Sequence, residues 1–145
     1  MSEKTVARVV IETLRDLGVR HVFGVPSGGW VDYMEALRTT DGIDFILTTH
    51  EGGAAMMADV CGRITGVPGV CFGTYGPGAT NLATGVGEAL LDRSPMIAFS
   101  DEMPAPMRGR VTQMGSWWET RSASWPSARS SAETTAPRMR STISR

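Results

Sequence analysis

The sequence predicts an α/β fold, a doubly wound parallel sheet with helices on both faces that is incomplete at its C-terminal end. Two observations carry this prediction. Along about the first hundred residues, apolar positions alternate between the three-and-four spacing of amphipathic helices and the short continuous runs of buried strands. Turns that contain glycine or proline separate these runs. Short apolar strands joined through helices are typical of parallel sheets that are covered on both faces.

The first predicted elements are a helix, a strand and a second helix. Apolar residues at helical spacing predict a helix over residues 6–17, and Gly18 follows where a left-handed C-terminal cap is expected. The run HVFGV, residues 21–25, is typical of a short buried strand, and PSGG after it is a turn. The second helix ends at TTDG and has four large residues on one face: Trp30, Tyr33, Met34 and Leu37.

The remaining elements continue the alternation. Strands are predicted at residues 43–49, 70–74 and 96–100, and helices at residues 51–64 and from about 79 to 91. Ligands of such sheets bind at the carboxyl ends of the strands. The segments VPSGG, THE and TYGPG each begin where a predicted strand stops, so we expect them to share one edge of the sheet.

Composition and charge exclude several classes of partner. A length of 145 residues allows one domain, and a net charge of -1 with a pI near 6.1 offers no field to attract nucleic acid or an anionic membrane. No apolar run approaches the roughly 18 residues that span a bilayer, and the N-terminus lacks a signal-peptide pattern. Cys61 and Cys71 do not have a close metal-ligand spacing, so we expect reduced core thiols in a cytoplasmic protein.

The character of the sequence changes near residue 101. Residues 1–103 are assigned to the foldable domain, and residues 104–145 to an atypical tail rich in arginine, serine and tryptophan. The segment from residue 101 onward contains no leucine and seven arginines, so rapid cleavage by trypsin is expected there. Two interpretations of the tail stay open: a disordered segment, or a segment translated out of frame.

Two short motifs point away from common chemistries. His50 and Glu51 are adjacent as in zinc proteases, but the position four residues after the histidine is Ala54, so a two-histidine metal site on this helix is excluded. The loop GTYGPGATN lacks the lysine of a phosphate-binding P-loop, and its Pro77 has no amide hydrogen to donate. Glycines on both sides of this proline instead predict a stiff turn that lets the backbone approach a flat ligand closely.

Three segments together carry a family resemblance. In chain order FGVPSGG, THEGGAAMMADVCGRITGVPGV and GTYGPGATNLATGVGEALLDRSPMIAFS resemble the N-terminal pyrimidine-binding domain of thiamine-diphosphate-dependent enzymes. The resemblance covers about residues 6–103 and is strongest to the branch that contains acetolactate synthase and 2-oxo acid decarboxylases. It implies thiamine diphosphate as the cofactor, and a lyase or transferase reaction at a carbon–carbon bond of a 2-oxo acid or aldehyde substrate.

The resemblance gives Glu51 a catalytic role. In the family, the matching glutamate hydrogen-bonds a ring nitrogen of the cofactor's aminopyrimidine and shuttles a proton there, which leads to activation of the thiazolium carbon. Such a carboxylate needs a largely dry site so that its proton affinity matches that of the ring nitrogen. The alternative is an ordinary acidic residue at a helix start, where the helix dipole favours it.

Other positions match family contacts one by one. The resemblance assigns cofactor binding to Val25, Pro26, Glu51, Thr74, Pro77 and Asn81. Ser27 lengthens the loop that follows Pro26 relative to most relatives, and Tyr75 replaces a small residue and is expected to narrow the pocket. His50 matches a position that is often histidine, with a hydrogen-bonded core imidazole as the alternative. Met56, Met57 and Ala58 are expected in the helix core.

The resemblance implies a metal-binding half that this sequence does not contain. Family members hold the diphosphate and Mg²⁺ on a second domain with a Gly-Asp-Gly triplet and a later asparagine, often from another subunit. Here the triplet is missing and the one asparagine is Asn81, so we expect no metal ligand in this chain. Three interpretations stay open: a truncated or frameshifted fragment of a longer enzyme, the small subunit of a two-chain decarboxylase, and a non-catalytic interaction domain. The expected partner is a homo-oligomer or a complementing diphosphate-domain chain.

Overall fold

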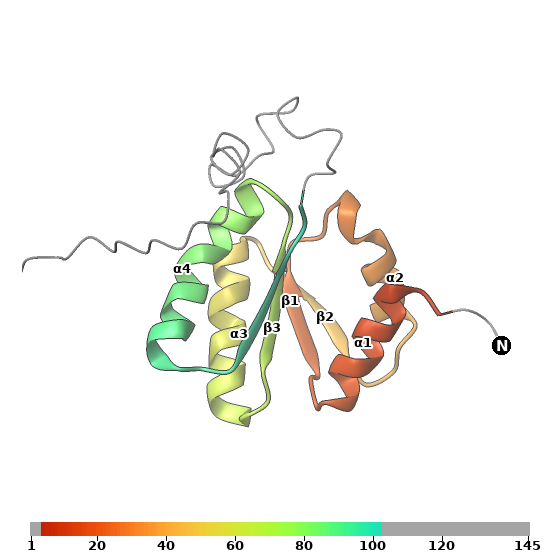
Figure 1. Cartoon of the computed structure of the whole chain (residues 1–145), viewed down its shortest axis with the longest axis horizontal. Helices are drawn as coiled ribbons and strands as arrows, with labels where there is room; N and C mark the ends of the chain where they lie inside the picture. Colours follow the sequence, from red (N-terminus) through yellow and green to blue (C-terminus); the bar gives the residue numbers. More distant parts are fainter. Residues whose placement is uncertain (1–3, 103–145) are drawn as a thin grey trace, which may run out of the picture.

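Helices and strands alternate along the chain (Figure 1). The computed structural model describes residues 4–102. In chain order, its elements are α1 (Val6–Asp16), β1 (His21–Gly24), the short 3₁₀ helix η1 (Gly28–Trp30), α2 (Val31–Arg38), β2 (Asp44–Leu47), α3 (Glu51–Thr65), β3 (Gly69–Gly73), α4 (Pro77–Asp92) and β4 (Met96–Ser100).

The four strands form one parallel sheet in the order β2-β1-β3-β4. The chain passes from β1 to β2 at one side, then crosses back over β1 to β3 and β4. The direction in which the sheet grows therefore reverses at β1, which places the topological switch point between β1 and β3. Gly24 at the end of β1 pairs with Phe72 of β3, so both strands end at the same edge of the sheet.

Helices cover both faces of the sheet, α1 and α2 on one and α3 and α4 on the other (Figure 1). This arrangement confirms the predicted doubly wound α/β fold. The central strand β3 is buried along its whole length, and Val70, Cys71 and Phe72 are each at most 1% exposed. A strand covered on both faces has no solvent side, so its sequence is a continuous apolar run instead of an alternating one.

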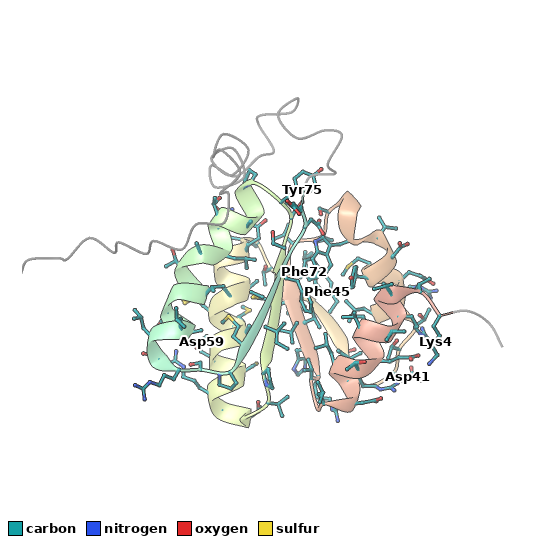
Figure 2. The ribbon with its side chains drawn as sticks, in the orientation of Figure 1. Lys4, Asp41, Phe45, Asp59, Phe72 and Tyr75 are labelled. Carbon is teal, nitrogen blue, oxygen red and sulfur yellow. The ribbon has the colours of Figure 1, made fainter. Side chains whose placement is uncertain are left out.

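The two faces are filled with different kinds of side chain. Under α1 and α2, the ring of Phe72 stacks on Trp30 at 4.1 Å between ring centroids and on Phe45 at 5.3 Å. Figure 2 labels the two phenylalanines in the middle of the fold. Under α3 and α4, the core contains three fully buried alanines, Ala54, Ala55 and Ala58. Large rings therefore set the spacing on one face, and small side chains let the helices approach closely on the other.

The face of α3 that packs inward differs in one residue from the prediction. Ala58 is buried and Met56 is partly buried, but Met57 is 48% exposed, so its assignment to the core is wrong. Each helical residue turns about 100° from the last, and Met57 consequently points away from the alanine face. Val60 and Ile64, at helical spacing from Met57, are also exposed.

Most element boundaries lie within two residues of their predicted positions. Strand β2 ends at Leu47 and not at residue 49, and the amide of Thr48 makes one further hydrogen bond to β1, to the carbonyl of Gly24 at 3.0 Å. Helix α4 begins two residues earlier than predicted, at Pro77. Proline suits the first helical position, where its missing N–H has no intrahelical partner to lose.

The predicted tail, residues 104–145, lies outside the described residues, and so do its predicted trypsin sites. Within residues 4–102, none of the helices combines the length and apolar character needed to cross a bilayer.

Candidate functional site

The carboxylate of Glu51 lies at the carboxyl edge of the sheet, on the first residue of α3. The residue is 8% exposed, and its Oε2 accepts a hydrogen bond from Nδ2 of Asn81 at 2.9 Å. The amino end of α3 also stabilises the negative charge through the helix dipole. Two residues that were singled out by motif, 30 positions apart, therefore meet at one point.

Two glycines leave the space that the Glu51 carboxylate occupies. A Cβ atom on Gly78 would lie 3.1 Å from Oε1 of Glu51 and 3.0 Å from Cγ2 of Thr74. A Cβ atom on Gly73 would lie 3.1 Å from Cγ of Glu51 and 2.8 Å from the carbonyl oxygen of Gly78. Any side chain at either position would therefore crowd the glutamate, and the first turn of α4 closes over it only because these side chains are absent.

His50 caps α3 and does not lie in the core. The residue is exposed, and Nδ1 of its ring accepts a hydrogen bond from the amide of Gly52 at 3.0 Å. A nitrogen that accepts carries no proton, so the neutral ring has its proton on Nε2. The alternative of a core imidazole is therefore wrong, and the histidine serves the helix start that carries Glu51.

The other predicted contact residues lie at the same edge. Val25 and Pro26 directly follow Gly24, the last residue of β1, while Thr74 and Tyr75 directly follow β3. Val25 and Thr74 are partly buried, and Pro26 is exposed. Figure 2 shows Tyr75 at this end of the sheet. Pro77 is exposed as the first residue of α4. The structure thus groups the predicted residues around the switch point, and among them a direct contact is shown for Glu51 and Asn81.

The arrangement leaves one carboxylate oxygen for chemistry. Among the described residues, Oε2 of Glu51 has the side-chain amide of Asn81 as its partner, and no hydrogen bond to Oε1 is found. Oε1 lies over the glycine-lined start of α4. A largely buried carboxylate can exchange a proton with the nitrogen of a flat ring through an oxygen that has no hydrogen-bond partner among the described residues and lies beside glycine backbone.

Sequence reasoning missed two contributors to this site. Gly73 ends a fully apolar strand, and a glycine there signals a close backbone approach. Thr48 ties the segment before α3 to β1 through its amide, a role that no side-chain pattern could reveal.

A second carboxylate, Asp101, follows β4 at the same edge of the sheet. Desolvation raises the pKa of Asp101, and the indole N–H of Trp30 opposes that rise. Asp101 Oδ2 lies against Gly29, yet neither Oδ2 nor Trp30 Nε1 makes a hydrogen bond of good geometry among the described residues. Burial therefore disfavours the ionised form of Asp101 in the folded chain.

We expect Asp101→Asn to remove one source of pH dependence from stability. Because folding raises the pKa of Asp101, the folded chain binds this proton more tightly than the unfolded chain does. Stability should fall as the pH rises above the ordinary pKa of 3.8. At neutral pH the asparagine variant should be the more stable chain, and near pH 3 the two should converge. Urea unfolding of both chains across this range checks it; a wild-type advantage at neutral pH would contradict the assignment.

Other features do not form a comparable site. A groove of about 440 Å³ lies between α1 and α2, but its cations Lys4 and Arg8 already pair with Glu12. Within residues 4–102, no group of three or more histidine, cysteine or acidic side chains is placed to hold a metal ion. Cys71 is a buried free thiol whose pKa is raised to about 12 by desolvation, and Cys61 is free and partly buried.

Comparison with known proteins places the chain in a family. Residues 4–122 match the family profile described as thiamine pyrophosphate enzyme, N-terminal TPP binding domain. The chain is 43% identical over 103 residues to an acetolactate synthase large subunit of Buchnera aphidicola from Acyrthosiphon pisum, which covers 71% of this chain and 18% of the relative. It is 46% identical over 103 residues to the acetolactate synthase isozyme 2 large subunit of Escherichia coli K12, and this match covers 71% of this chain and 19% of the relative.

A plant relative gives a similar result. Acetolactate synthase 2, chloroplastic, of Nicotiana tabacum is 42% identical over 101 residues, covering 70% of this chain and 15% of the relative. The chain therefore spans about a fifth of the length of these curated relatives or less. By its sequence match and its fold, the chain belongs to the thiamine pyrophosphate enzyme family, and the matched region is the family's N-terminal TPP binding domain.

Proposed function

We propose that this domain binds the aminopyrimidine ring of thiamine diphosphate at the carboxyl edge of β1 and β3. The residues proposed to form the site of the ring are Val25, Pro26, Glu51, Thr74, Pro77 and Asn81. Glu51 is the catalytic residue, which holds and moves a proton at a ring nitrogen. The single observation that carries the proposal is the buried carboxylate of Glu51, hydrogen-bonded on one oxygen only, beside the glycine-lined start of α4.

The residues present fit a flat, hydrogen-bonding ring. Gly73 and Gly78 clear the space above the carboxylate, where a Cβ atom would stand within about 3 Å of Glu51. Oε1 of Glu51 supplies an acceptor, or a donor when it is protonated. Val25 and Pro26 offer apolar contacts from the neighbouring strand, and such a mixture of apolar lining and a few fixed polar groups is usual in cofactor sites.

The proposed reaction class follows from the cofactor and the relatives. Bound thiamine diphosphate supplies an electron sink for making or breaking the bond next to a carbonyl carbon. Because the relatives are named acetolactate synthases, we propose an acetolactate synthase-like reaction on a 2-oxo acid or an aldehyde. The diphosphate and its Mg²⁺ are proposed to bind to a separate domain, on a second copy or on a complementing chain, and the chain alone is proposed to be inactive.

Titration of the full chain with thiamine diphosphate tests the binding half of this proposal. We expect weak binding, in about the millimolar range, with little dependence on Mg²⁺, because the strongly charged anchor would lie elsewhere. Gly78→Ala should weaken binding severalfold further, because its Cβ would crowd Oε1 of Glu51 and Thr74. Calorimetry or ligand-observed NMR measures both effects.

Gly87→Ala is the matched control for this titration. Gly87 lies on the same helix, and a Cβ atom there would meet nothing within 4 Å, so this variant should bind like the wild type. Tight, Mg²⁺-dependent binding by the chain alone would contradict the proposed division of the site. Equal binding by the Gly78→Ala and Gly87→Ala variants would show that the ring binds elsewhere.

A second candidate function is that of a non-catalytic interaction domain. The observation that favours it is the exposed apolar stripe on α3, which contains Met57, Val60 and Ile64 at helical spacing. Such a stripe suits a partner helix or a second copy of the domain. An interaction domain would bind its partner equally well with glutamate or glutamine at position 51, whereas the catalytic proposal requires the glutamate.

A further inference from the structure

We infer that Asn81 is a positioning residue that acts through Glu51 and is not itself a direct contact of the cofactor ring. Its side-chain amide fixes one oxygen of the Glu51 carboxylate and so leaves the other as the oxygen that handles the proton. This inference rests on the proposed function, and it concerns how the site is built from residues of this chain alone.

The hydrogen bond joins the starts of two helices. Nδ2 of Asn81, in the second turn of α4, donates to Oε2 of Glu51, the first residue of α3, at 2.9 Å. Both residues are at least partly buried, and Glu51 is 8% exposed. A hydrogen bond donated to a carboxylate away from water is stronger than one between neutral groups, so it can set the orientation of the side chain.

The packing of α3 against α4 fixes the register of this bond. A Cβ atom on Gly85 would come within 2.5 Å of the Cβ of Ala55, so the helices touch directly one turn beyond Asn81. At the far end, Arg63 of α3 donates to Asp92 of α4 at 2.8 Å. Neither helix can slide along the other without breaking one of these contacts, and the amide of Asn81 is therefore held beside the carboxylate.

The two carboxylate oxygens of Glu51 have different roles, because an amide and a carboxylate differ in their chemistry. An amide N–H does not ionise near neutral pH, so Asn81 can donate a hydrogen bond to Oε2 but cannot take part in proton transfer. The transferable proton is held at Oε1, which lies over Gly78. When the O–H bond at Oε1 breaks, the electron pair stays on the carboxylate and the negative charge is shared with Oε2, where the Asn81 amide stabilises it.

The side-chain amide of Asn81 can be observed directly in the full chain. The sequence contains one asparagine, Asn81, and one glutamine, Gln113, so a ¹⁵N spectrum shows only two side-chain amide pairs. We expect one of the Asn81 protons to exchange slowly with water. In a Glu51→Ala variant its exchange should become at least about tenfold faster, as for an amide that has lost a charged partner, with Gln113 as the internal reference. Unchanged exchange would overturn the inference.

A double-mutant cycle with thiamine separates positioning from direct contact. Thiamine carries the aminopyrimidine ring without the diphosphate, so it reports on this half-site alone. We expect Asn81→Ala and Glu51→Ala to weaken its binding by similar factors, roughly fivefold or more, and the double variant to be no weaker than Glu51→Ala alone. A double variant whose loss equals the product of the two single losses would show that Asn81 contacts the ring directly and would overturn the inference.

Two further variants serve as a replacement for Asn81→Ala and as a control. Asn81→Ser repeats the cycle with a smaller polar side chain in case the alanine variant fails to fold. Thr84→Ala, on an exposed position of the same helix, should change neither the amide exchange nor the binding. If thiamine does not bind the wild-type chain at all, the proposed function fails, and the amide exchange in Glu51→Ala then decides the positioning of Glu51 independently.

Discussion

Replacing Gly69 with alanine is expected to prevent stable folding of the chain. Gly69 opens the central strand β3, and a Cβ atom there would overlap the carbonyl oxygen, carbonyl carbon and Cα of Ala58 on α3. All three are backbone atoms of a helix that also packs against α4, so no side chain can rotate away. Overpacking of a core costs about 1–3 kcal/mol when side chains can adjust, and here the loss should exceed about 3 kcal/mol.

A loss of that size is a large part of the 5–15 kcal/mol by which domains are typically stable. Far-UV circular dichroism and urea unfolding of the two chains measure it. Gly53→Ala is the matched control, because Gly53 lies on α3 and a Cβ atom there meets nothing within 4 Å. Alanine in place of glycine in an exposed helix should raise stability, by up to about 1 kcal/mol. If both variants unfold alike, the close approach of α3 to β3 is not what limits position 69.

The order of helices and strands could be predicted because each element carries its own local signal. Strand β3 reads as VCF between glycines, and helix α3 has its alanines at helical spacing, so periodicity alone separates the two. The sequence alone did not decide which residues of α3 face the core. Met56, Met57 and Ala58 are all acceptable in a core, and only the position of the sheet decides that Met57 faces outward.

The candidate site could be predicted only in part, for a different physical reason. The resemblance brought Glu51 and Asn81 together as family positions, but no spacing rule states that an amide 30 residues away donates to the carboxylate. The contact of Gly69 with Ala58 is equally invisible in the sequence, since a glycine at a strand start has many possible reasons. Asp101 carries no local pattern, because its raised pKa arises from burial at the end of β4.

Glu51→Gln is expected to abolish most proton transfer in the assembled site while leaving cofactor binding nearly unchanged. The experiment mixes this chain with a chain that carries the diphosphate domain and follows hydrogen–deuterium exchange at the thiazolium carbon of added thiamine diphosphate. General acid–base groups contribute about 10²–10⁴-fold to such steps, so exchange should slow by at least about a hundredfold. Calorimetry on the same mixture should show an affinity within a fewfold of wild type, because most of the binding free energy comes from the charged diphosphate and Mg²⁺.

The Glu51→Gln variant tests the proton-transfer role of Glu51 specifically. Glutamine keeps the size of the side chain and an oxygen that can still accept the Asn81 hydrogen bond at the position of Oε2. It removes only the ionisable group, so a folded variant isolates proton transfer from positioning. Glu88→Gln makes the same chemical change on α4, where the carboxylate is 44% exposed and lies 3.9 Å from Arg63, and it should leave exchange unchanged. Exchange at the wild-type rate in Glu51→Gln would exclude this carboxylate as the proton carrier. A loss of binding as large as the loss of exchange would mean that Glu51 anchors the ring, and its catalytic role would have to be assigned to another group at the carboxyl edge of the sheet.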